Sequence, residues 1–217
     1  MANKKYDAVF FDFDGTLCDS WQIVYKTYIE TLLYFEPSAS VEHVEAIRTC
    51  NDYMKSFQLL FKRQMVSSEI LDYANITYYK NLDDVTPLFD GIPILINQLK
   101  NCKIPLGIVT TKKRIFVEKI ISQYSVLQDF DTVICAEDVK NGKPNPEGLL
   151  KACANLCVDT GKSVYIGDLP ADILAATNCG MDSILACYGY ANDDDKKNTS
   201  STVVAISPSD IEKILFF

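Results

Sequence analysis

Two aspartates separated by a single residue end a short apolar segment near the N-terminus. Residues 8–13 are almost entirely hydrophobic, and they lead into the sequence Asp12-Phe13-Asp14-Gly15. Side chains two residues apart on a strand point to the same side, so we expect both carboxylates at one strand end. Carboxylates packed against apolar residues repel each other unless a cation or a shared proton lies between them. A turn motif explains one of these aspartates but hardly both.

Two further carboxylates follow another apolar segment. Residues 163–167 lead into Asp168, and Asp172 comes four residues later. These acidic residues follow strand ends, and no basic residue lies in the same motif. Such groups are suitable ligands for a hard cation, above all Mg²⁺. Asp172 also falls in the first turn of a helix predicted to begin at Pro170, where an acid stabilises the helix dipole. Both a site-related and a purely structural role therefore stay open for Asp172.

Hydroxyl and ammonium groups follow other predicted elements. Thr110 and Thr111 come directly after an apolar segment, where their hydroxyls could bind a phosphate oxygen, although threonine is common at strand ends. Lys143 precedes Pro144-Asn145-Pro146, in which Asn145 can cap a helix that begins at Pro146. We expect this rigid connection to direct Lys143 toward the carboxylates instead of leaving it in solvent.

Apolar segments alternate with amphipathic ones along most of the chain. The apolar segments, each short enough for a buried strand, lie at residues 8–13, 104–110, 132–135, 163–167, 183–187 and 202–206. This alternation predicts an α/β fold, a doubly wound, Rossmann-like parallel sheet. Ligands bind such sheets beyond the carboxyl ends of the strands, which is where the polar residues described above fall.

One region interrupts the alternation. Between residues 17 and 86 hydrophobic side chains recur at helical spacing three times in succession, at Trp21-Val24-Tyr28-Leu32, at Met54-Phe57-Phe61-Met65 and at Leu71-Ala74-Tyr78-Leu82. We therefore expect a core domain formed by residues 1–16 and 87–217, with an all-helical domain, residues 17–86, inserted after the first strand.

Composition excludes several classes of protein. The 217 residues are 48% hydrophobic and 23% charged, which is typical of a globular protein. A net charge of −8 disfavours nucleic acid and anionic membrane surfaces as partners. No apolar run approaches the roughly 20 residues that span a bilayer, and no signal-peptide core follows the N-terminus. We expect a cytoplasmic protein.

Histidine and cysteine chemistry has little support. The single histidine, His43, is predicted to be a solvated helix residue, so a Ser-His-Asp triad or a zinc site would rest on one side chain. The eight cysteines form no Cys-x-x-Cys motif and lie in apolar stretches, which favours buried free thiols.

The motifs resemble, in order, the four motifs of the haloacid dehalogenase superfamily. They are Asp12-x-Asp14-Gly15-Thr16, Thr110 after its strand, Lys143-Pro144-x-Pro146 and Gly167-Asp168-x-x-x-Asp172. The inserted helical region is similar to that superfamily's C1 cap. Residues 16–20 and 207–211 are similar to the corresponding segments of phosphoglycolate-phosphatase-like members. The resemblance thus covers the whole chain.

The resemblance implies a phosphatase that hydrolyses a small phosphorylated metabolite. Asp12 would be the nucleophile that becomes an aspartyl phosphate, and Asp14 would protonate the leaving group and then activate water. Thr110, Thr111 and Lys143 would bind the phosphoryl group. Mg²⁺ would be bound by Asp12, the backbone carbonyl of Asp14 and Asp168. An acid at position 14 favours phosphoryl transfer over dehalogenation, whose leaving group needs no proton.

Two other interpretations stay open. A β-phosphoglucomutase-like mutase shares every motif and differs in protecting the phosphoenzyme from water. A receiver-like binding module also places aspartate, threonine and lysine at strand ends, although it is usually about half as long as this chain. The sequence identifies neither the substrate nor the oligomeric state.

Overall fold

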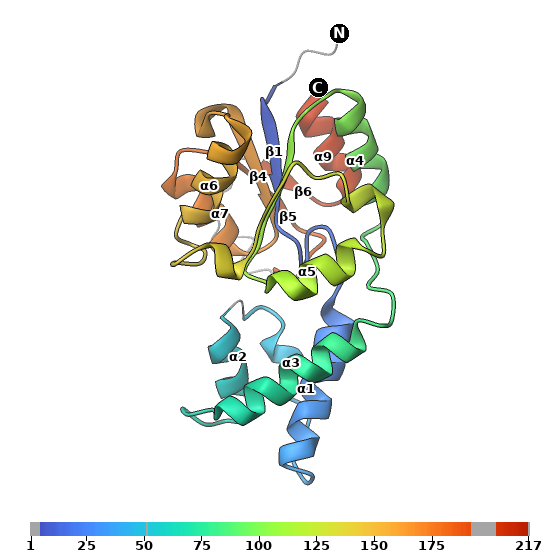
Figure 1. The fold of residues 1–217 in the computed structure, drawn as a ribbon, viewed down its shortest axis with the longest axis vertical. Coiled ribbons are helices and arrows are strands. Elements are labelled where there is room, and N and C mark those ends of the chain that lie inside the picture. Colours follow the sequence, from blue (N-terminus) through green and yellow to red (C-terminus); the bar gives the residue numbers. More distant parts are fainter. Residues whose placement is uncertain (1–4, 51, 192–202, 217) are drawn as a thin grey trace. The chain divides into compact units, whose positions relative to one another are not determined.

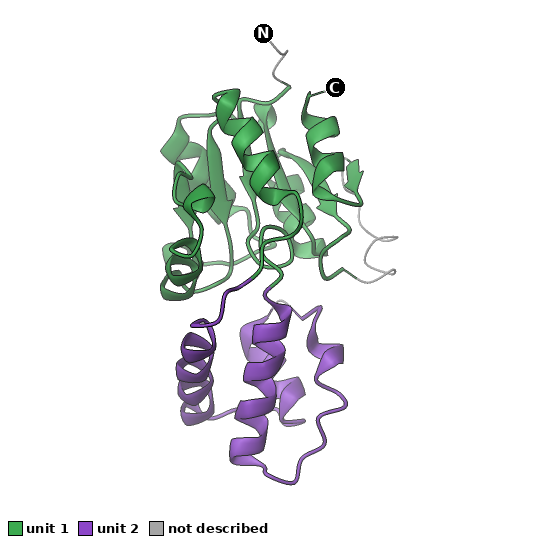
Figure 2. Cartoon of the chain, turned by 90° about the vertical axis from the view of Figure 1, so that its right-hand side faces the viewer, with its two compact units in different colours: residues 1–19, 87–217 green, residues 20–86 purple. Residues whose placement is uncertain are grey.

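The protein divides into two compact units. The computed structural model describes residues 5–50, 52–191 and 203–216. Unit 1 comprises Met1–Asp19 and Pro87–Phe217, and unit 2 comprises Ser20–Thr86 (Figure 2). The boundary in the first connection therefore falls at Ser20, three residues beyond the position expected from the hydrophobic pattern, because residues 17–19 bond to the core: Leu17 O accepts from Phe89 N and Asp19 N donates to Pro87 O.

Within its described residues, unit 1 is built on a six-stranded parallel sheet. The strands are β1 (Ala8–Phe11), β2 (Leu106–Val109), β3 (Thr132–Ile134), β4 (Ser163–Gly167), β5 (Asp182–Ala186) and β6 (Val203–Ala205). Their order is β3-β2-β1-β4-β5-β6, and every pairing is parallel. The predicted doubly wound α/β fold is confirmed.

Helices cover both faces of this sheet. Helices α4 (Ile92–Asn101) and α9 (Pro208–Phe216) lie on one face, and α6 (Glu147–Leu156) and α7 (Pro170–Asn178) lie on the other (Figure 1). Helix α5 (Arg114–Ile121) joins β2 to β3. Every residue of β1, β2 and β4 is buried, which explains why these strands are almost continuously apolar in sequence.

The strand order reverses beside β1. Phe11 pairs with Ile108 of β2 on one side and with Ile166 of β4 on the other. The chain runs outward from β1 to β2 and β3, and then returns to β4 next to β1. Ligands of doubly wound sheets bind at such a reversal point. The carboxyl ends of β1, β2 and β4 are thereby neighbours.

Unit 2 is helical in its described residues. It contains α1 (Trp21–Phe35), the 3₁₀ turn η1 (Glu45–Ile47), α2 (Tyr53–Leu60) and α3 (Ser68–Asn81). Asp52 caps α2 by accepting a hydrogen bond from Lys55 N at 2.8 Å. Buried residues of all four elements form one core: Leu32, Val44, Ile47, Phe57, Leu60, Phe61, Ile70 and Ala74.

Two local expectations for unit 2 are wrong. The hydrophobic pattern extends the middle helix to Met65, but α2 ends at Leu60 and the Met65 residue is 86% exposed. Lys62 adopts a left-handed φ of 51°, which a continuing helix does not allow. His43 lies in a turn and not in a helix, and its Nε2 is 2.8 Å from the carbonyl oxygen of Leu60.

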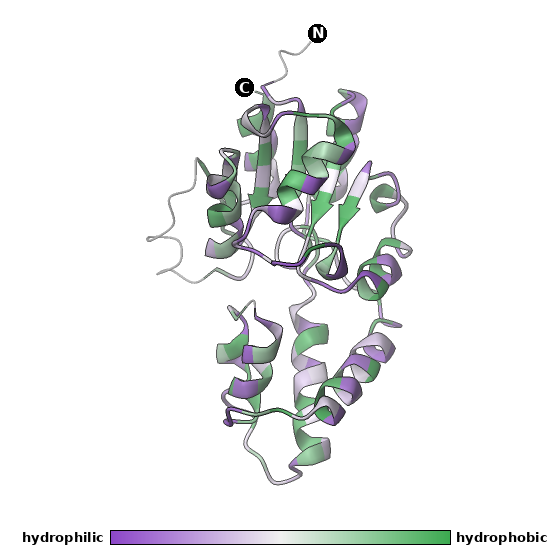
Figure 3. Cartoon of the chain, turned by 60° about the vertical axis from the view of Figure 1, so that its left-hand side comes forward, coloured by the Kyte–Doolittle hydropathy of each residue, from purple (hydrophilic) through white to green (hydrophobic). Residues whose placement is uncertain are grey.

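Hydropathy follows the same division into interior and surface. The strands are coloured as hydrophobic, and helices of both units alternate hydrophobic and hydrophilic residues (Figure 3). In the described part of the chain, no helix combines the length and the apolar character needed to cross a membrane. All eight cysteines lie among the described residues and are free thiols, but only Cys18, Cys135 and Cys153 are buried, four are partly buried, and Cys157 is exposed.

Candidate active site

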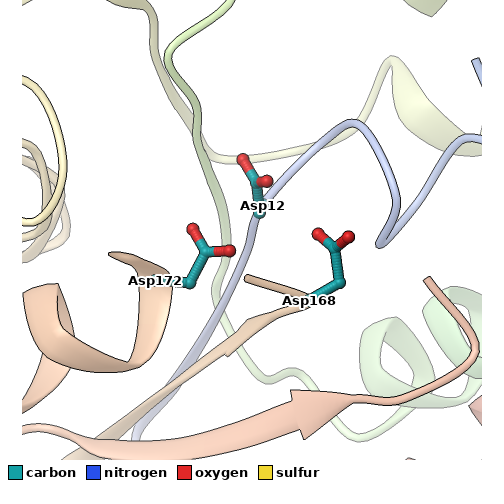
Figure 4. A group of neighbouring side chains, drawn as sticks. All are labelled: Asp12, Asp168 and Asp172. Carbon is teal, nitrogen blue, oxygen red and sulfur yellow. The ribbon is translucent and has the colours of Figure 1, made fainter. Parts of the chain in front are cut away.

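Three aspartates meet where β1 and β4 end. Asp12 follows β1, Asp168 follows β4 and Asp172 lies in the first turn of α7. All three residues are buried, and one oxygen of each carboxylate lies within 4.8 Å of the others. The carboxylates point to the same side of the strand ends (Figure 4). The structure therefore brings together three of the acidic residues that the sequence placed at strand ends.

Lys143 joins this cluster from the loop before α6. Its Nζ lies 2.7 Å from Asp12 Oδ1 and 2.5 Å from Asp172 Oδ1. It also donates a hydrogen bond to the Tyr165 hydroxyl at 3.0 Å, and that hydroxyl donates to Val109 O at 2.7 Å. Only 8% of the Lys143 side chain is exposed. The ammonium is thus held inside the cluster.

Two hydrogen bonds fix the loop directly after Lys143. Asn145 Oδ1 accepts a hydrogen bond from Glu147 N at 3.0 Å, and Asn178 Nδ2 donates to Pro144 O at 2.9 Å. Helix α6 begins at Glu147, one residue later than the sequence predicts, with Pro146 as its N-cap residue. Asn145 nevertheless supplies the capping oxygen.

Burial and charge shift the pKa values of the clustered groups. Burial raises the pKa of Asp12 to about 7; Lys143 opposes this shift, and Asp172 adds to it. Burial, together with Asp172 and Asp12, raises the pKa of Asp168 well above its usual range. Burial alone would lower the pKa of Lys143, but Asp12 and Asp172 reverse this effect and raise it. The carboxylates of Asp12 and Asp168 therefore have too little positive charge nearby to offset their burial.

The residues present fit a divalent cation. Counting Asp14 with the three clustered aspartates gives four carboxylates, against the ammonium groups of Lys143 and Lys112 that contact them. Asp12 Oδ1 is buried, and Lys143 Nζ lies 2.7 Å from it. Oxygen donors with unbalanced negative charge are the ligands that hard cations such as Mg²⁺ prefer.

Asp172 combines the two roles that the sequence left open. Its Oδ2 accepts a hydrogen bond from Leu169 N at 2.9 Å, so it caps α7 as a helix residue. Its Oδ1 lies against Lys143, and the Tyr165 hydroxyl oxygen is 3.3 Å from it. Because both of its oxygens already have partners, Asp172 is better suited to holding Lys143 in place than to coordinating a metal.

Asp168 is fixed by a tight approach of two loops. Its Oδ1 accepts a hydrogen bond from Thr16 Oγ1 at 3.3 Å, and its Oδ2 accepts one from Tyr190 N at 2.8 Å. A Cβ at Gly15 would lie 2.2 Å from Asp168 Oδ2, and one at Gly189 would lie 2.4 Å from the Asp168 Cβ. Gly15 also has a φ of 78°, which side chains rarely adopt. Glycine is therefore required at both positions.

The Asp14 carboxylate lies outside the group of three that could share a cation. It accepts two hydrogen bonds from Lys112 Nζ, at 2.9 and 2.8 Å. The carboxyl group of Asp14 is therefore engaged by a lysine, and its expected contribution to a metal site would come from its backbone carbonyl.

The two threonines differ in their surroundings. Thr110 is buried, and its Oγ1 accepts a hydrogen bond from Lys112 N at 3.2 Å, which leaves its own proton available for a ligand. Thr111 is exposed. Both threonines and Lys143 line a cavity of about 220 Å³ between the ends of β2 and β3 and the start of α6.

Three contacts escaped prediction from the sequence. Lys112 donates to Asp14, the Tyr165 hydroxyl accepts from Lys143, and Tyr190 N donates to Asp168. Lys112 follows a pair of threonines at a strand end, but nothing near it in the sequence specifies its partner. Tyr165 lies in the middle of an apolar strand, where nothing distinguishes it from a core residue.

Comparisons with known proteins agree with this geometry. The family model described as "Haloacid dehalogenase-like hydrolase" matches residues 9–186. Phosphoglycolate phosphatase of Xanthomonas campestris pv. campestris is 29% identical over 93% of this chain and 92% of its own. Pyrophosphatase PpaX of Bacillus velezensis is 27% identical over 83% of this chain and 82% of its own.

A solved structure supports the fold. The crystal structure of a hydrolase of this family, family IA, variant 3, from Entamoeba histolytica covers 96% of this chain and 97% of its own, with a TM-score of 0.82 and 21% identity. The matched region includes every motif residue from Asp12 to Asp172. The chain belongs to the haloacid dehalogenase-like hydrolase family.

Proposed function

We propose that this protein is a Mg²⁺-dependent phosphatase that hydrolyses a small phosphorylated metabolite through an aspartyl phosphate on Asp12. The observation that carries the proposal is the position of Asp12, a buried carboxylate 2.7 Å from the Lys143 ammonium and within 4.8 Å of oxygens of Asp168 and Asp172. A nucleophile, a cation for the phosphoryl oxygens and a group of metal ligands are thus adjacent. The relatives whose names state phosphatase or pyrophosphatase activity support this assignment.

In the first half of the reaction Asp12 attacks phosphorus. A bond forms between a carboxylate oxygen and phosphorus, and the bond between phosphorus and the ester oxygen breaks. The departing oxygen takes a proton from the Asp14 carboxyl group. Lys143 Nζ and the Thr110 hydroxyl bind the phosphoryl oxygens, whose negative charge grows in the transition state.

In the second half Asp14 accepts a proton from water. The resulting hydroxide attacks phosphorus, the bond to the Asp12 oxygen breaks, and inorganic phosphate leaves. Asp12 and Asp14 return to their starting states, so the cycle balances. Asp172 and the Tyr165 hydroxyl keep Lys143 in place throughout, since both contact its ammonium.

Asp12, Asp168 and the backbone carbonyl of Asp14 would hold Mg²⁺. The cation would neutralise charge on the transferring phosphoryl group and on the attacking carboxylate. Its preferred ligands are oxygens, which the cluster offers.

Unit 2 is assigned the role of a cap that selects the substrate. An inserted helical unit, Ser20–Thr86, interrupts the core between β1 and α4. The two relatives carry names with different substrates, phosphoglycolate and pyrophosphate. The chemistry is therefore assigned to unit 1, and the choice of metabolite to unit 2.

A panel of phosphorylated metabolites tests the proposal. Purified protein should release inorganic phosphate from at least one small monoester in the presence of Mg²⁺, and exhaustive chelation should abolish release until Mg²⁺ is restored. Full activity after chelation would exclude the metal requirement. Formation of an isomer of a sugar phosphate in place of free phosphate would identify a mutase, and inactivity toward every compound would favour a binding module.

A further inference from the structure

A second lysine, Lys112, is held against the predicted acid-base residue. Its Nζ donates to both oxygens of Asp14, at 2.9 and 2.8 Å, although the two residues are 98 positions apart in the chain. The exposed fraction of the side chain is 8% for Lys112 and 27% for Asp14. This pair is separate from the cluster around Asp12, where Lys143 is the ammonium group.

Stability does not explain an ion pair of this kind. A lysine that is 8% exposed has lost most of its hydration, and the loss offsets much of the attraction to the carboxylate. Replacing such a pair with apolar residues of similar volume is often neutral or stabilising. The Lys112–Asp14 contact therefore points to a requirement other than the stability of the fold.

The base of the Lys112 side chain is fixed. Its backbone N donates to Thr110 Oγ1 at 3.2 Å, and its backbone O accepts from Ala136 N at 3.0 Å. The residue follows β2, whose Ile108 pairs with Phe11 of β1. Lys112 thus reaches across from the neighbouring strand end, with its main chain anchored on both sides.

The Asp14 main chain is fixed as well, but its side chain needs a partner. Gly15 N donates to Cys18 O at 2.9 Å, and Cys18 N donates to Phe13 O at 2.9 Å, so the turn around Asp14 is closed. The partly exposed carboxylate can still rotate about its side-chain bonds. Two hydrogen bonds to one ammonium group restrict that rotation.

We propose that Lys112 is a positioning residue that holds the Asp14 carboxyl group in the orientation needed to exchange a proton with the leaving oxygen. An acid or base must lie within hydrogen-bond distance of the proton it transfers. Lys112 N orients the Thr110 hydroxyl while Lys112 Nζ orients Asp14, so one three-residue segment sets the phosphoryl oxygens and the proton donor relative to each other. This inference rests on the proposed function.

The choice of leaving group separates this role from others. An alkyl phosphate needs a proton on its leaving oxygen, whereas p-nitrophenolate leaves without one. Lys112→Met should therefore lower kcat for an alkyl phosphate about 10- to 100-fold, less than the full contribution of a general acid. We expect a change of less than about 3-fold in the pre-steady-state rate of p-nitrophenolate release, which reports the first half of the reaction alone, and in the dissociation constant of either substrate, because binding of the phosphoryl group is left to Lys143 and Thr110.

A double-mutant cycle and two further variants complete the experiment. In an Asp14→Asn background, Lys112→Met should cause no additional loss in kcat for the alkyl phosphate, since the group that it positions is gone. Lys112→Arg should restore much of the activity because it keeps a cation in place. The matched control is Lys162→Met at an exposed lysine of the same unit, which should behave as wild type.

The outcomes are distinguishable. A higher KM with unchanged kcat would overturn the inference and make Lys112 a substrate-binding residue. Equal losses with both substrates in the first half of the reaction, additive with Asp14→Asn, would also overturn it and leave a structural role. If the wild-type protein with Mg²⁺ hydrolysed neither ester, the proposed function would fail in that first measurement, and the inference with it.

Discussion

The two units of the molecule differ in how deeply their ion pairs are buried. In unit 1, Lys112 and Lys143 are each 8% exposed and contact carboxylates at the strand ends. In unit 2, the ion pair between Arg63 and Glu36 is exposed by 43% and 42%. Exposed pairs contribute roughly 0–1 kcal/mol to stability, whereas buried charges cost several kcal/mol of desolvation each. Buried charge in unit 1 therefore indicates chemistry.

The interior of unit 2 consists of apolar and aromatic contacts. Phe57 packs edge-on against Tyr28 at 5.4 Å and Tyr53 at 5.1 Å between ring centroids. Burial of such side chains, at roughly 25 cal/mol per Å², stabilises helices that would be marginal alone. Substitutions at the unit 1 site should therefore change activity more than stability, and substitutions in the unit 2 core should do the reverse.

The largest effect is expected from Asp12→Asn. Without the nucleophile, turnover of any phosphate monoester should fall to background, measured by phosphate release at saturating Mg²⁺. The free energy of unfolding should not decrease, because an uncharged amide replaces a carboxylate whose pKa burial raises to about 7. Lys143 keeps Asp172 as a partner.

The matched control for Asp12→Asn is the same change at the exposed Asp159, which should leave turnover unaltered. Near-normal turnover by Asp12→Asn would show that another residue attacks phosphorus. A large loss of stability would show that the strand-end charges also hold unit 1 together, and the contrast between the units would disappear.

Phe57→Ala tests the opposite side of the comparison. Phe57 is 1% exposed, and truncating a buried phenylalanine typically costs about 3–5 kcal/mol. Trp21 is the single tryptophan of the chain and lies in unit 2, so its fluorescence during urea unfolding reports on this unit. We expect the midpoint to fall to a lower urea concentration.

Leu59→Ala on the same helix is the control, because Leu59 is 44% exposed and should cost much less. If the two variants unfolded at the same urea concentration, the core of unit 2 would not depend on Phe57.

Lys143→Ala should have the next largest effect. Removing one preorganised donor to a developing charge costs about 10²–10³ in kcat, or about 2.7–4 kcal/mol. The measurement needs saturating Mg²⁺, since removal of the ammonium also changes the charge around Asp12 and Asp172. Lys162→Ala is the control, and equal small losses from both variants would reassign Lys143 to a solvated loop.

Much of the fold could be predicted because burial leaves a regular mark on sequence. Strands buried on both faces read as continuous apolar segments, and β1, β2 and β4 lie within the predicted ranges. Helix ends were harder. Local backbone geometry at Lys62 ends α2, although apolar residues continue to Met65. The His43 turn depends on a contact with Leu60, which lies 17 residues away and leaves no periodic signal.

The candidate site was predictable where strand ends bring residues together. Asp12 and Asp168 meet because neighbouring parallel strands end at one edge of the sheet, and Lys143 reaches them from the loop before α6. The Lys112–Asp14 pair could not be predicted, because a lysine after a strand is usually solvated and nothing local specifies a partner 98 residues away. Asp172 had two explanations in sequence, and the structure shows that the helix cap and the contact with Lys143 coexist.

The smallest effect is expected from the exposed ion pair of unit 2. Arg63 lies 2.7 Å from Glu36, and its guanidinium also lies 4.7 Å from the centre of the Phe61 ring. Glu36→Gln removes the charge pair but leaves the contact with the ring. We expect the free energy of unfolding to fall by less than about 1 kcal/mol, as measured by Trp21 fluorescence in urea.

Salt sharpens this last test. At about 1 M ionic strength the Debye length is roughly 3 Å, so the difference between wild type and Glu36→Gln should vanish there. Glu42→Gln, at an exposed position of the same unit, is the control and should show no difference at any salt concentration. Turnover of p-nitrophenyl phosphate should be unchanged in both variants, because the proposed catalytic residues lie in unit 1. If Glu36→Gln lost more than about 2 kcal/mol of unfolding free energy and the loss persisted in salt, unit 2, like unit 1, would depend on a charge pair shielded from solvent. The two units would then differ only in degree.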